Sequence, residues 1–246
     1  MSEVLALYCK SLKLSGNLIA NANAIERENH IDFLAELFRL EIDYREAKRK
    51  SRYIIQAKFE VLKTFGDYNF EKIEIPASIT VADIKDGGFI SRKENLILYG
   101  PSGRGKTHMA VAAGVCACNK GKKVRFYRAT SLVNELVDAQ KLGTLRTLLK
   151  SFDKVDLLIC DELGYIPLDN DGAKLLYQVL ADCYERKSLI ITTNLEFNKW
   201  NTIFYDDKLT AAILDRIVHH SHLLIFDNPL SHRVEHSLMN SGRKPI

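Results

Sequence analysis

One segment of eight residues limits the possible folds of this chain more than any other. Residues 100–107 read Gly-Pro-Ser-Gly-Arg-Gly-Lys-Thr and match the pattern GxxxxGK[ST] in full. An apolar run at 95–99 precedes the segment, and a helix-forming stretch at 108–119 follows it. Glycines let consecutive backbone N–H groups point at phosphate oxygens, and the start of a helix adds the positive end of its dipole. The order of strand, glycine-rich loop and helix therefore predicts a phosphate-binding loop.

The loop assigns roles to its own residues. We expect Lys106 to pair with the β- and γ-phosphates of ATP and the Thr107 hydroxyl to ligate Mg²⁺. The residues predicted to bind the nucleotide are Gly100, Pro101, Ser102, Gly103, Arg104, Gly105, Lys106, Thr107 and His108.

Two carboxylates, Asp161 and Glu162, follow another apolar run at 155–160. A parallel strand delivers such residues to its carboxyl end, where open α/β sheets bind ligands. Asp161 is suited to hold Mg²⁺, directly or through water, and Glu162 to orient and polarise the attacking water as general base. A protein that only transfers phosphate to another substrate does not need the second carboxylate, so the pair favours ATP hydrolysis.

Asn194 stands at the end of the apolar run 189–193. Beside the γ-phosphate, its side chain can hydrogen-bond both the phosphate and the lytic water. The alternative is that Asn194 caps a helix from Leu195 onward.

Short apolar runs alternate with helical patterns after about residue 71, which predicts an α/β fold with a parallel five-stranded sheet sandwiched by helices. The runs are 95–99, 123–127, 155–160, 189–193 and 223–226. Before them, Ile31, Leu34, Leu37, Phe38 and Ile42 recur at helical steps and predict a small all-helical domain with one apolar face. The predicted division is a helical domain for DNA binding and assembly at 1–70 and an ATPase domain at 71–246.

Positive charge is concentrated between residues 44 and 63, where seven basic residues stand against two acidic ones. A DNA backbone could lie along such a helix and displace counterions, with little sequence preference. The alternative is a solvated helical face. The residues predicted to bind DNA are Arg45, Lys48, Arg49, Lys50 and Arg52. Tyr44 and Tyr53 flank this run and either stack on bases or pack.

Composition is that of a water-soluble globular protein, with 46% hydrophobic and 27% charged residues and a net charge of +4. No run of about 18 apolar residues and no signal peptide is recognisable, so we expect a cytoplasmic protein without a membrane partner. The five cysteines lack CxxC spacing and are expected to be reduced. His219, His220 and His222 have no carboxylate or cysteine at ligand spacing, so we expect no metal there.

The motifs together resemble one family. The succession GPSGRGKTH, VDLLICDELGY, ITTN, LDRI and SHR looks like that of the IstB-type insertion-sequence transposition helper ATPases, which are similar to DnaC-type helicase loaders within the AAA+ superfamily. The resemblance covers nearly the whole chain. It implies that Arg216 is an arginine finger for the γ-phosphate of a neighbouring subunit, and that Arg233 is a sensor-two residue. His232 stands where the family usually has Tyr, and Arg104 where it mostly has a small residue.

The resemblance also implies a function. The chain would assemble with ATP into a homo-oligomer, a ring or spiral with shared active sites, remodel duplex target DNA and deliver it to a partner transposase. The expected catalytic residues are Lys106, Glu162, Asn194, Arg216 and Arg233. Two alternatives remain open: a DnaC-like helicase loader, and a nucleotide-dependent DNA scaffold that does not hydrolyse ATP.

Overall fold

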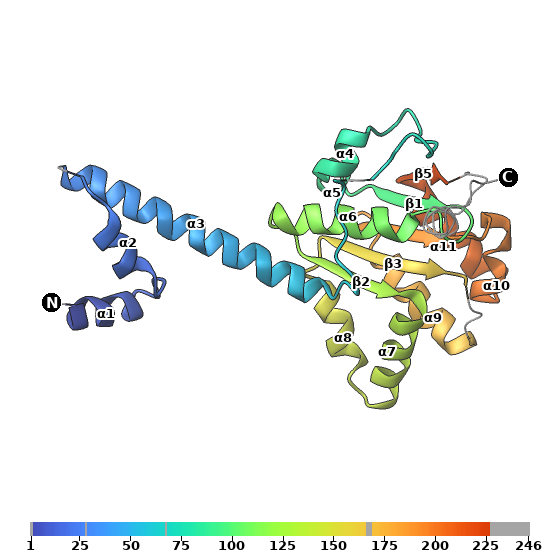
Figure 1. Cartoon of the computed structure of the whole chain (residues 1–246). Coiled ribbons are helices and arrows are strands. Elements are labelled where there is room, and N and C mark those ends of the chain that lie inside the picture. The colour runs from blue at the N-terminus through green and yellow to red at the C-terminus, as the bar shows by residue number, and fades with distance from the viewer. Residues whose placement is uncertain (1, 28, 67, 166–168, 227–246) are drawn as a thin grey trace, which may run out of the picture. The chain divides into compact units, whose positions relative to one another are not determined.

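The structure, a computed structural model, describes residues 2–27, 29–66, 68–165 and 169–226. It contains two compact units, residues 1–52 and 53–246, which we describe one at a time (Figure 1). Within the described ranges, no helix is both long enough and apolar enough to span a bilayer.

The first unit is all-helical, as predicted for the N-terminal region. It holds α1 (Ser2–Ser11), α2 (Leu18–Ala24) and most of α3 (His30–Ala57). Its small core contains the buried side chains of Cys9, Leu18 and Leu37.

The apolar face predicted for α3 is mostly exposed. Leu37 is buried, but the other four residues of the predicted stripe remain 42–70% exposed: Ile31, Leu34, Phe38 and Ile42. The reason is that the preceding segments pack against another flank of α3, where Phe33 joins Leu37 in the core. On the same flank, the buried Glu41 accepts a hydrogen bond of 2.9 Å from the backbone N–H of Ser15.

The second unit is built on a five-stranded parallel sheet, which confirms the predicted fold class. The strand order is β2-β3-β4-β1-β5. The strands are β1 (Asn95–Tyr99), β2 (Val124–Arg128), β3 (Leu157–Leu163), β4 (Ser188–Thr193) and β5 (Ser221–Ile225). Each lies within a few residues of a predicted apolar run. The central strands are buried on both faces because helices cover both, which is why their sequences are mostly apolar.

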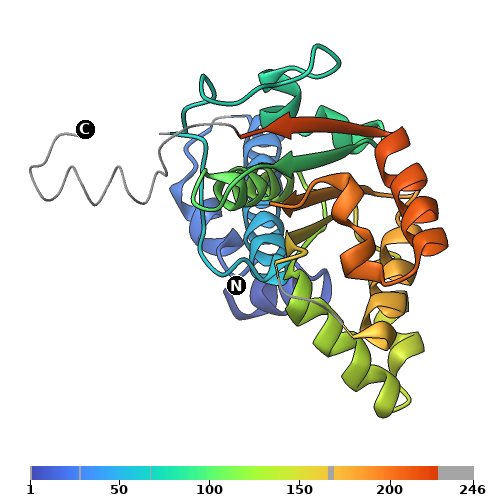
Figure 2. The same ribbon diagram turned by 90° about the vertical axis from the view of Figure 1, so that its right-hand side faces the viewer.

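Alternate residues of one strand point into two different cores. Leu96 and Leu98 of β1 face the core shared with α4 (Val81–Asp86), α5 (Gly88–Ser91) and α6 (Lys106–Asn119). Ile97 faces the opposite core, and Figure 2 shows α6 (green) and α11 (orange-red) on opposite sides of the sheet. The helices of that second layer are α7 (Ala129–Lys141), α8 (Leu145–Phe152), α9 (Asn170–Ala181), α10 (Asn201–Phe204) and α11 (Asp207–His219), with the 3-10 turn η1 (Phe197–Lys199).

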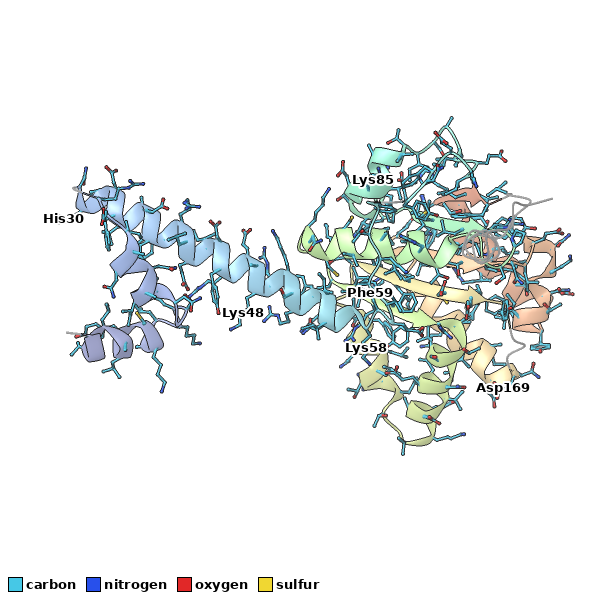
Figure 3. All side chains as sticks on the ribbon, in the orientation of Figure 1. His30, Lys48, Lys58, Phe59, Lys85 and Asp169 are labelled. Atoms are coloured by element: carbon cyan, nitrogen blue, oxygen red, sulfur yellow. The ribbon has the colours of Figure 1, made fainter. Side chains whose placement is uncertain are left out.

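The boundary between the units lies between Arg52 and Tyr53, whereas the sequence placed it near Phe70. The difference arises because residues of the segments 53–66 and 68–70 pack on the core of the second unit. Ala57 is fully buried there, and the Phe59 ring, labelled in Figure 3, lies 6.0 Å from that of Phe126. Tyr53 also packs against this core, which is one of the two uses left open for it.

Candidate nucleotide-binding site

The phosphate-binding loop lies between the end of β1 and the start of α6. Gly100 has φ of 147°, and a Cβ atom there would lie 2.5 Å from the backbone oxygen of Phe226. Gly105 precedes α6 with φ of 93°. Side chains at these positions would be strained or would clash, so the glycines allow the tight curl of the loop.

A cavity of about 940 Å³ opens beside this loop and has the size of a small-molecule site. Its wall also includes residues of the segments 60–63 and 68–73 and of the ends of β3 and β4. Of the predicted site residues, the cavity wall contains Ser102, Gly103, Arg104, Gly105, Lys106, Thr107, His108, Glu162 and Asn194. The structure therefore brings most of the predicted nucleotide site together around one space.

Lys106 is held by the carbonyl groups of its own loop. Its Nζ donates hydrogen bonds of 2.6 Å to Gly100 O and 2.7 Å to Pro101 O. Burial lowers the pKa of Lys106 to about 8, although the charges of Asp161 and Glu162 oppose this shift. A phosphate group would supply the anionic partner that this half-buried amine lacks.

Asp161 lies behind the loop and is only 2% exposed. The Thr192 hydroxyl donates a hydrogen bond of 2.5 Å to its Oδ1 atom, and the Thr107 hydroxyl lies 3.0 Å from the same oxygen. Burial raises the pKa of Asp161, while these two hydrogen bonds oppose the rise. The sequence motif contains Asp161 but not Thr192, whose only signal in the sequence is its place near the end of an apolar run.

The arrangement fits a magnesium ion. The Thr107 hydroxyl and the Asp161 carboxylate offer oxygen ligands side by side, which suits a hard cation. Over the described ranges there is no group of three or more acidic, histidine or cysteine side chains that could form a protein-only metal cage. Magnesium here would take its remaining ligands from nucleotide phosphates and water, as it does in many phosphoryl-transfer sites.

Glu162 adopts a left-handed backbone conformation with φ of 61°. Its N–H donates a hydrogen bond of 2.8 Å to Thr192 Oγ1, which helps to hold this costly geometry in place. The Glu162 side chain lines the cavity, with its Oε2 atom 3.9 Å from Arg128 Nε. Arg128 also bonds Glu60 Oε2 at 2.5 Å, and sequence reasoning identified neither Arg128 nor Glu60 as part of the site.

Asn194 is exposed and lines the cavity. The alternative of a helix cap is wrong, because the next element is the short turn η1, which begins after Glu196. The Thr193 hydroxyl instead accepts a hydrogen bond of 3.0 Å from Leu195 N–H. Asn194 is therefore a residue of the cavity wall that caps no helix.

Tyr68, which precedes the first strand of the sheet, contacts the phosphate-binding loop. The Tyr68 hydroxyl donates a hydrogen bond of 3.1 Å to Gly105 O, and its ring lies 4.9 Å from that of His108. His108 Nε2 in turn lies 2.8 Å from Thr64 O. Burial raises the pKa of Tyr68 above its usual range. The sequence did not predict a role for Tyr68, because an isolated tyrosine outside any motif has no characteristic spacing to other site residues.

Of the two arginines carried over from the resemblance, only Arg216 lies within the described residues. Arg216 does not line the cavity of its own chain; on α11, its guanidinium bonds the Tyr177 hydroxyl and lies 5.9 Å from the centre of that ring. Arg233 and His232 lie outside the described residues.

The predicted DNA-binding residues all lie on α3 in the first unit. Lys48 and Arg49 are exposed, and Lys50 is half-buried. Arg45 has a structural role, because it pairs with the buried Glu41 at 2.6 Å and donates to Lys13 O at 2.5 Å. Figure 3 labels Lys48 along the helix.

His222 is a buried structural residue between two partners. Its Nδ1 atom lies 2.8 Å from Ser78 Oγ, and its Nε2 atom lies 3.0 Å from Glu94 Oε2. This pair of hydrogen bonds ties the start of β5 to the segments before α4 and β1.

Solved structures share the fold of the second unit. The chain is similar to the DnaC helicase loader, with a TM-score of 0.53 and 22% identity over 72% of this chain and 99% of that one. It is also similar to the replication initiator DnaA, in a structure bound to AMPPCP and single-stranded DNA, with a TM-score of 0.52 and 20% identity over 67% and 51% of the two chains. These likenesses identify an AAA+-type P-loop fold.

Sequence relatives come from bacterial insertion sequences. The chain is 34% identical over 226 residues, 90% of both chains, to the ATP-binding protein of insertion sequence IS5376 from Geobacillus stearothermophilus. It is 36% identical to that of IS232 from Bacillus thuringiensis subsp. berliner, over 78% of this chain and 76% of the relative. The family model for IstB-like ATP binding proteins matches residues 9–239. This chain belongs to the IstB-like ATP binding protein family.

Proposed function

We propose that this protein is a cytoplasmic ATPase that assists DNA transposition. In its ATP-bound form it assembles on duplex target DNA, remodels it and delivers it to a partner transposase. The observation that carries the ATPase part is the chain of contacts from Thr107 through Asp161 and Thr192 to Glu162, at the edge of a phosphate-binding loop. The names of the relatives, ATP-binding proteins of insertion sequences, support the transposition part.

Lys106 and the backbone N–H groups of the loop bind the β- and γ-phosphates, and Lys106 exchanges its two carbonyl partners for phosphate oxygens. Thr107 and Asp161 would hold Mg²⁺, which would offset charge on the phosphates. Asn194, at the cavity wall, orients the water that attacks the γ-phosphorus. Glu162 takes the proton of that water as the bond to ADP breaks, and ADP and phosphate leave.

The remaining catalytic cation comes from a second subunit. Arg216 is half-buried and held by Tyr177, away from the cavity of its own chain. An arginine in that position can complete a neighbour's site in a homo-oligomeric ring or spiral. Hydrolysis therefore depends on assembly, and Arg233 reports the nucleotide state.

DNA binds along α3 through Lys48, Arg49, Lys50 and Arg52. Phosphate contacts of this kind position a protein on duplex DNA without reading its sequence. The relatives' association with mobile DNA favours this function over that of a helicase loader.

Phosphate release by wild type and Glu162→Gln, with and without duplex DNA, tests the ATPase. We expect Glu162→Gln to bind Mg-ATP but to lose turnover, while Glu196→Gln, an exposed control outside the cavity wall, keeps it. Equal turnover in wild type and Glu162→Gln would remove the catalytic role of Glu162. Nucleotide binding without turnover, even with DNA, would favour the scaffold.

Two further measurements address assembly and DNA. Mixing Arg216→Ala with Lys106→Ala subunits should restore part of the activity, because some mixed sites would contain both intact residues; no rescue would contradict shared sites. ATP-dependent affinity for duplex and single-stranded DNA separates the two DNA functions. A strong single-strand preference would favour the helicase loader.

A further inference from the structure

The side chain of Arg104 is unusual within the phosphate-binding loop. Its Nε and Nη1 atoms are buried and have no hydrogen-bond partner in the part of the chain that the structure describes. The residue lines the same cavity as Lys106 and Thr107. A guanidinium group cannot deprotonate in a protein, so this is a permanent charge with unused donors.

Buried charges are normally paired, because removal from water without a partner is costly. The nearby carboxylates have other partners. Asp161 accepts from Thr107 and Thr192, and Glu162 lies 3.9 Å from Arg128. Two Arg104 donors are therefore without an acceptor in the wall of a cavity that an anion can enter.

Arg104 and Lys106 lie two residues apart in the loop and line the same cavity. Two cations and the start of α6 thus converge on one space, and each makes the others less stable when no anion is present. A polyphosphate relieves this repulsion and supplies several oxygens for the planar donors of a guanidinium.

We propose that the Arg104 side chain is a second cationic ligand for the polyphosphate of the bound nucleotide, in addition to Lys106. The proposal rests on the proposed nucleotide-binding function and deepens it. It makes affinity depend more steeply on the number of phosphates than Lys106 alone would. It also makes Arg104 a cause of instability in the nucleotide-free protein and a cause of stability in the complex.

Isothermal titration calorimetry with Mg-ATP, Mg-ADP and adenosine tests the proposal. Arg104→Val should bind Mg-ATP about 10- to 100-fold more weakly than wild type, as expected for the loss of charge-assisted hydrogen bonds. The loss should be smaller for Mg-ADP and absent for adenosine, which has no phosphate. Arg104→Lys should keep part of the affinity. Arg186→Val, at an exposed arginine outside the cavity wall, should bind like wild type.

Thermal unfolding gives a second readout that does not depend on turnover. Nucleotide-free Arg104→Val should melt at the same temperature as wild type or higher, because a buried unpaired charge is removed. Saturating Mg-ATP should then raise its melting temperature less than that of wild type. A valine in this place does not strain the backbone, since Arg104 is not among the residues with positive φ.

The proposal is overturned if Arg104→Val binds Mg-ATP as tightly as wild type. It is also overturned if affinity is kept and only assembly is lost, because Arg104 would then contact a neighbouring subunit. Failure of the nucleotide site itself looks different. In that case wild type would not bind Mg-ATP, or Lys106→Ala would bind it equally well.

Discussion

The Thr192 hydroxyl lies 2.5 Å from the Asp161 carboxylate and accepts a hydrogen bond from the backbone N–H of Glu162 at 2.8 Å. One side chain on β4 therefore contacts both acidic residues near the end of β3. The contact exists because β3 and β4 are neighbours in the sheet, in a register that pairs Cys160 with Ile191. Thr192 links the proposed metal ligand to the proposed general base.

Replacing Thr192 by Val removes this link with little change in volume. The pKa of Asp161, already raised by burial, should rise further because one opposing hydrogen bond is removed. Since Mg²⁺ binds the ionised carboxylate, we expect half-maximal ATPase activity of Thr192→Val to need about tenfold more Mg²⁺ than wild type. The magnitude follows from a hydrogen bond to a charged group, which is worth about 1.5–3 kcal/mol. Titration of the ATPase activity with Mg²⁺ at pH 6 to 8 measures this change in Mg²⁺ requirement.

Thr192→Ser is the matched control, since it keeps the hydroxyl. The defect of Thr192→Val should grow as the pH falls, because a raised carboxyl pKa means that protonation begins at a higher pH. An equal defect in both variants would show that packing, and not the hydrogen bond, is what matters at this position.

Lys106 should make nucleotide affinity depend on pH. Its pKa is about 8 in the nucleotide-free protein, and phosphate contacts should raise it in the complex. Below pH 8 both forms are protonated and this group contributes no slope. Above pH 8 binding must take up a proton, so Mg-ATP affinity should fall by about tenfold per pH unit until the pKa of the complex is reached.

Calorimetry at about pH 8.5 in buffers of different ionisation enthalpy measures this proton uptake directly. Lys106→Arg is the control, because an arginine stays charged throughout this range and should show no uptake. A flat affinity for the wild type between pH 8 and about pH 9.5 would contradict the lowered pKa.

The sequence predicted those parts of the site whose residues are close to one another in the chain. The glycines of residues 100–107 allow the conformation of the loop, and Asp161 and Glu162 come directly after the apolar run 155–160, near the end of β3. Thr192 could not be assigned, because its role depends on which strands are neighbours. Tyr68 reaches Gly105 across 37 positions of sequence, and no periodicity records such a contact.

The N-terminal part of the structure differs from the prediction for a similar reason. Apolar residues on α3 cover a wide arc, and periodicity does not reveal which flank its neighbours cover. In the structure, α1 and α2 pack against the flank of α3 that contains Phe33 and Leu37. The predicted domain boundary differs from the observed one because α3 continues unbroken to Ala57. No turn or glycine therefore marks the point at which the chain passes from one unit to the other.

Gly100→Ala should disable the phosphate-binding loop. The position combines φ of 147° with backbone atoms of Phe226 in the space of a Cβ, so either the loop or the end of β5 must shift. We expect a loss of stability of about 2 kcal/mol or more, together with weaker Mg-ATP binding. Urea unfolding and calorimetry measure the two effects.

Gly143→Ala separates the two causes. Gly143 also has a positive φ, of 71°, but nothing lies within 4 Å of its Cβ position. It should cost only about 1 kcal/mol and leave nucleotide binding intact. Equal costs at Gly100 and Gly143 would mean that the close approach to Phe226 contributes nothing.

The basic residues of α3 should divide into two groups that a pooled substitution would hide. Charge reversal at Lys48 and Arg49, which are exposed, should weaken duplex binding and reduce the slope of log affinity against log salt by about 0.9 for each DNA phosphate that is no longer neutralised. Arg45→Ala should act differently, because it leaves the buried Glu41 without its ionic partner. We expect it to destabilise the helical unit, with a lower melting temperature and an unchanged salt slope for the fraction that remains folded. If the salt dependence of duplex affinity fell equally for Arg45→Ala and for charge reversal of Lys48 alone, Arg45 would contact the DNA. The hydrogen bond from Arg45 to Lys13 O would then be secondary to that contact.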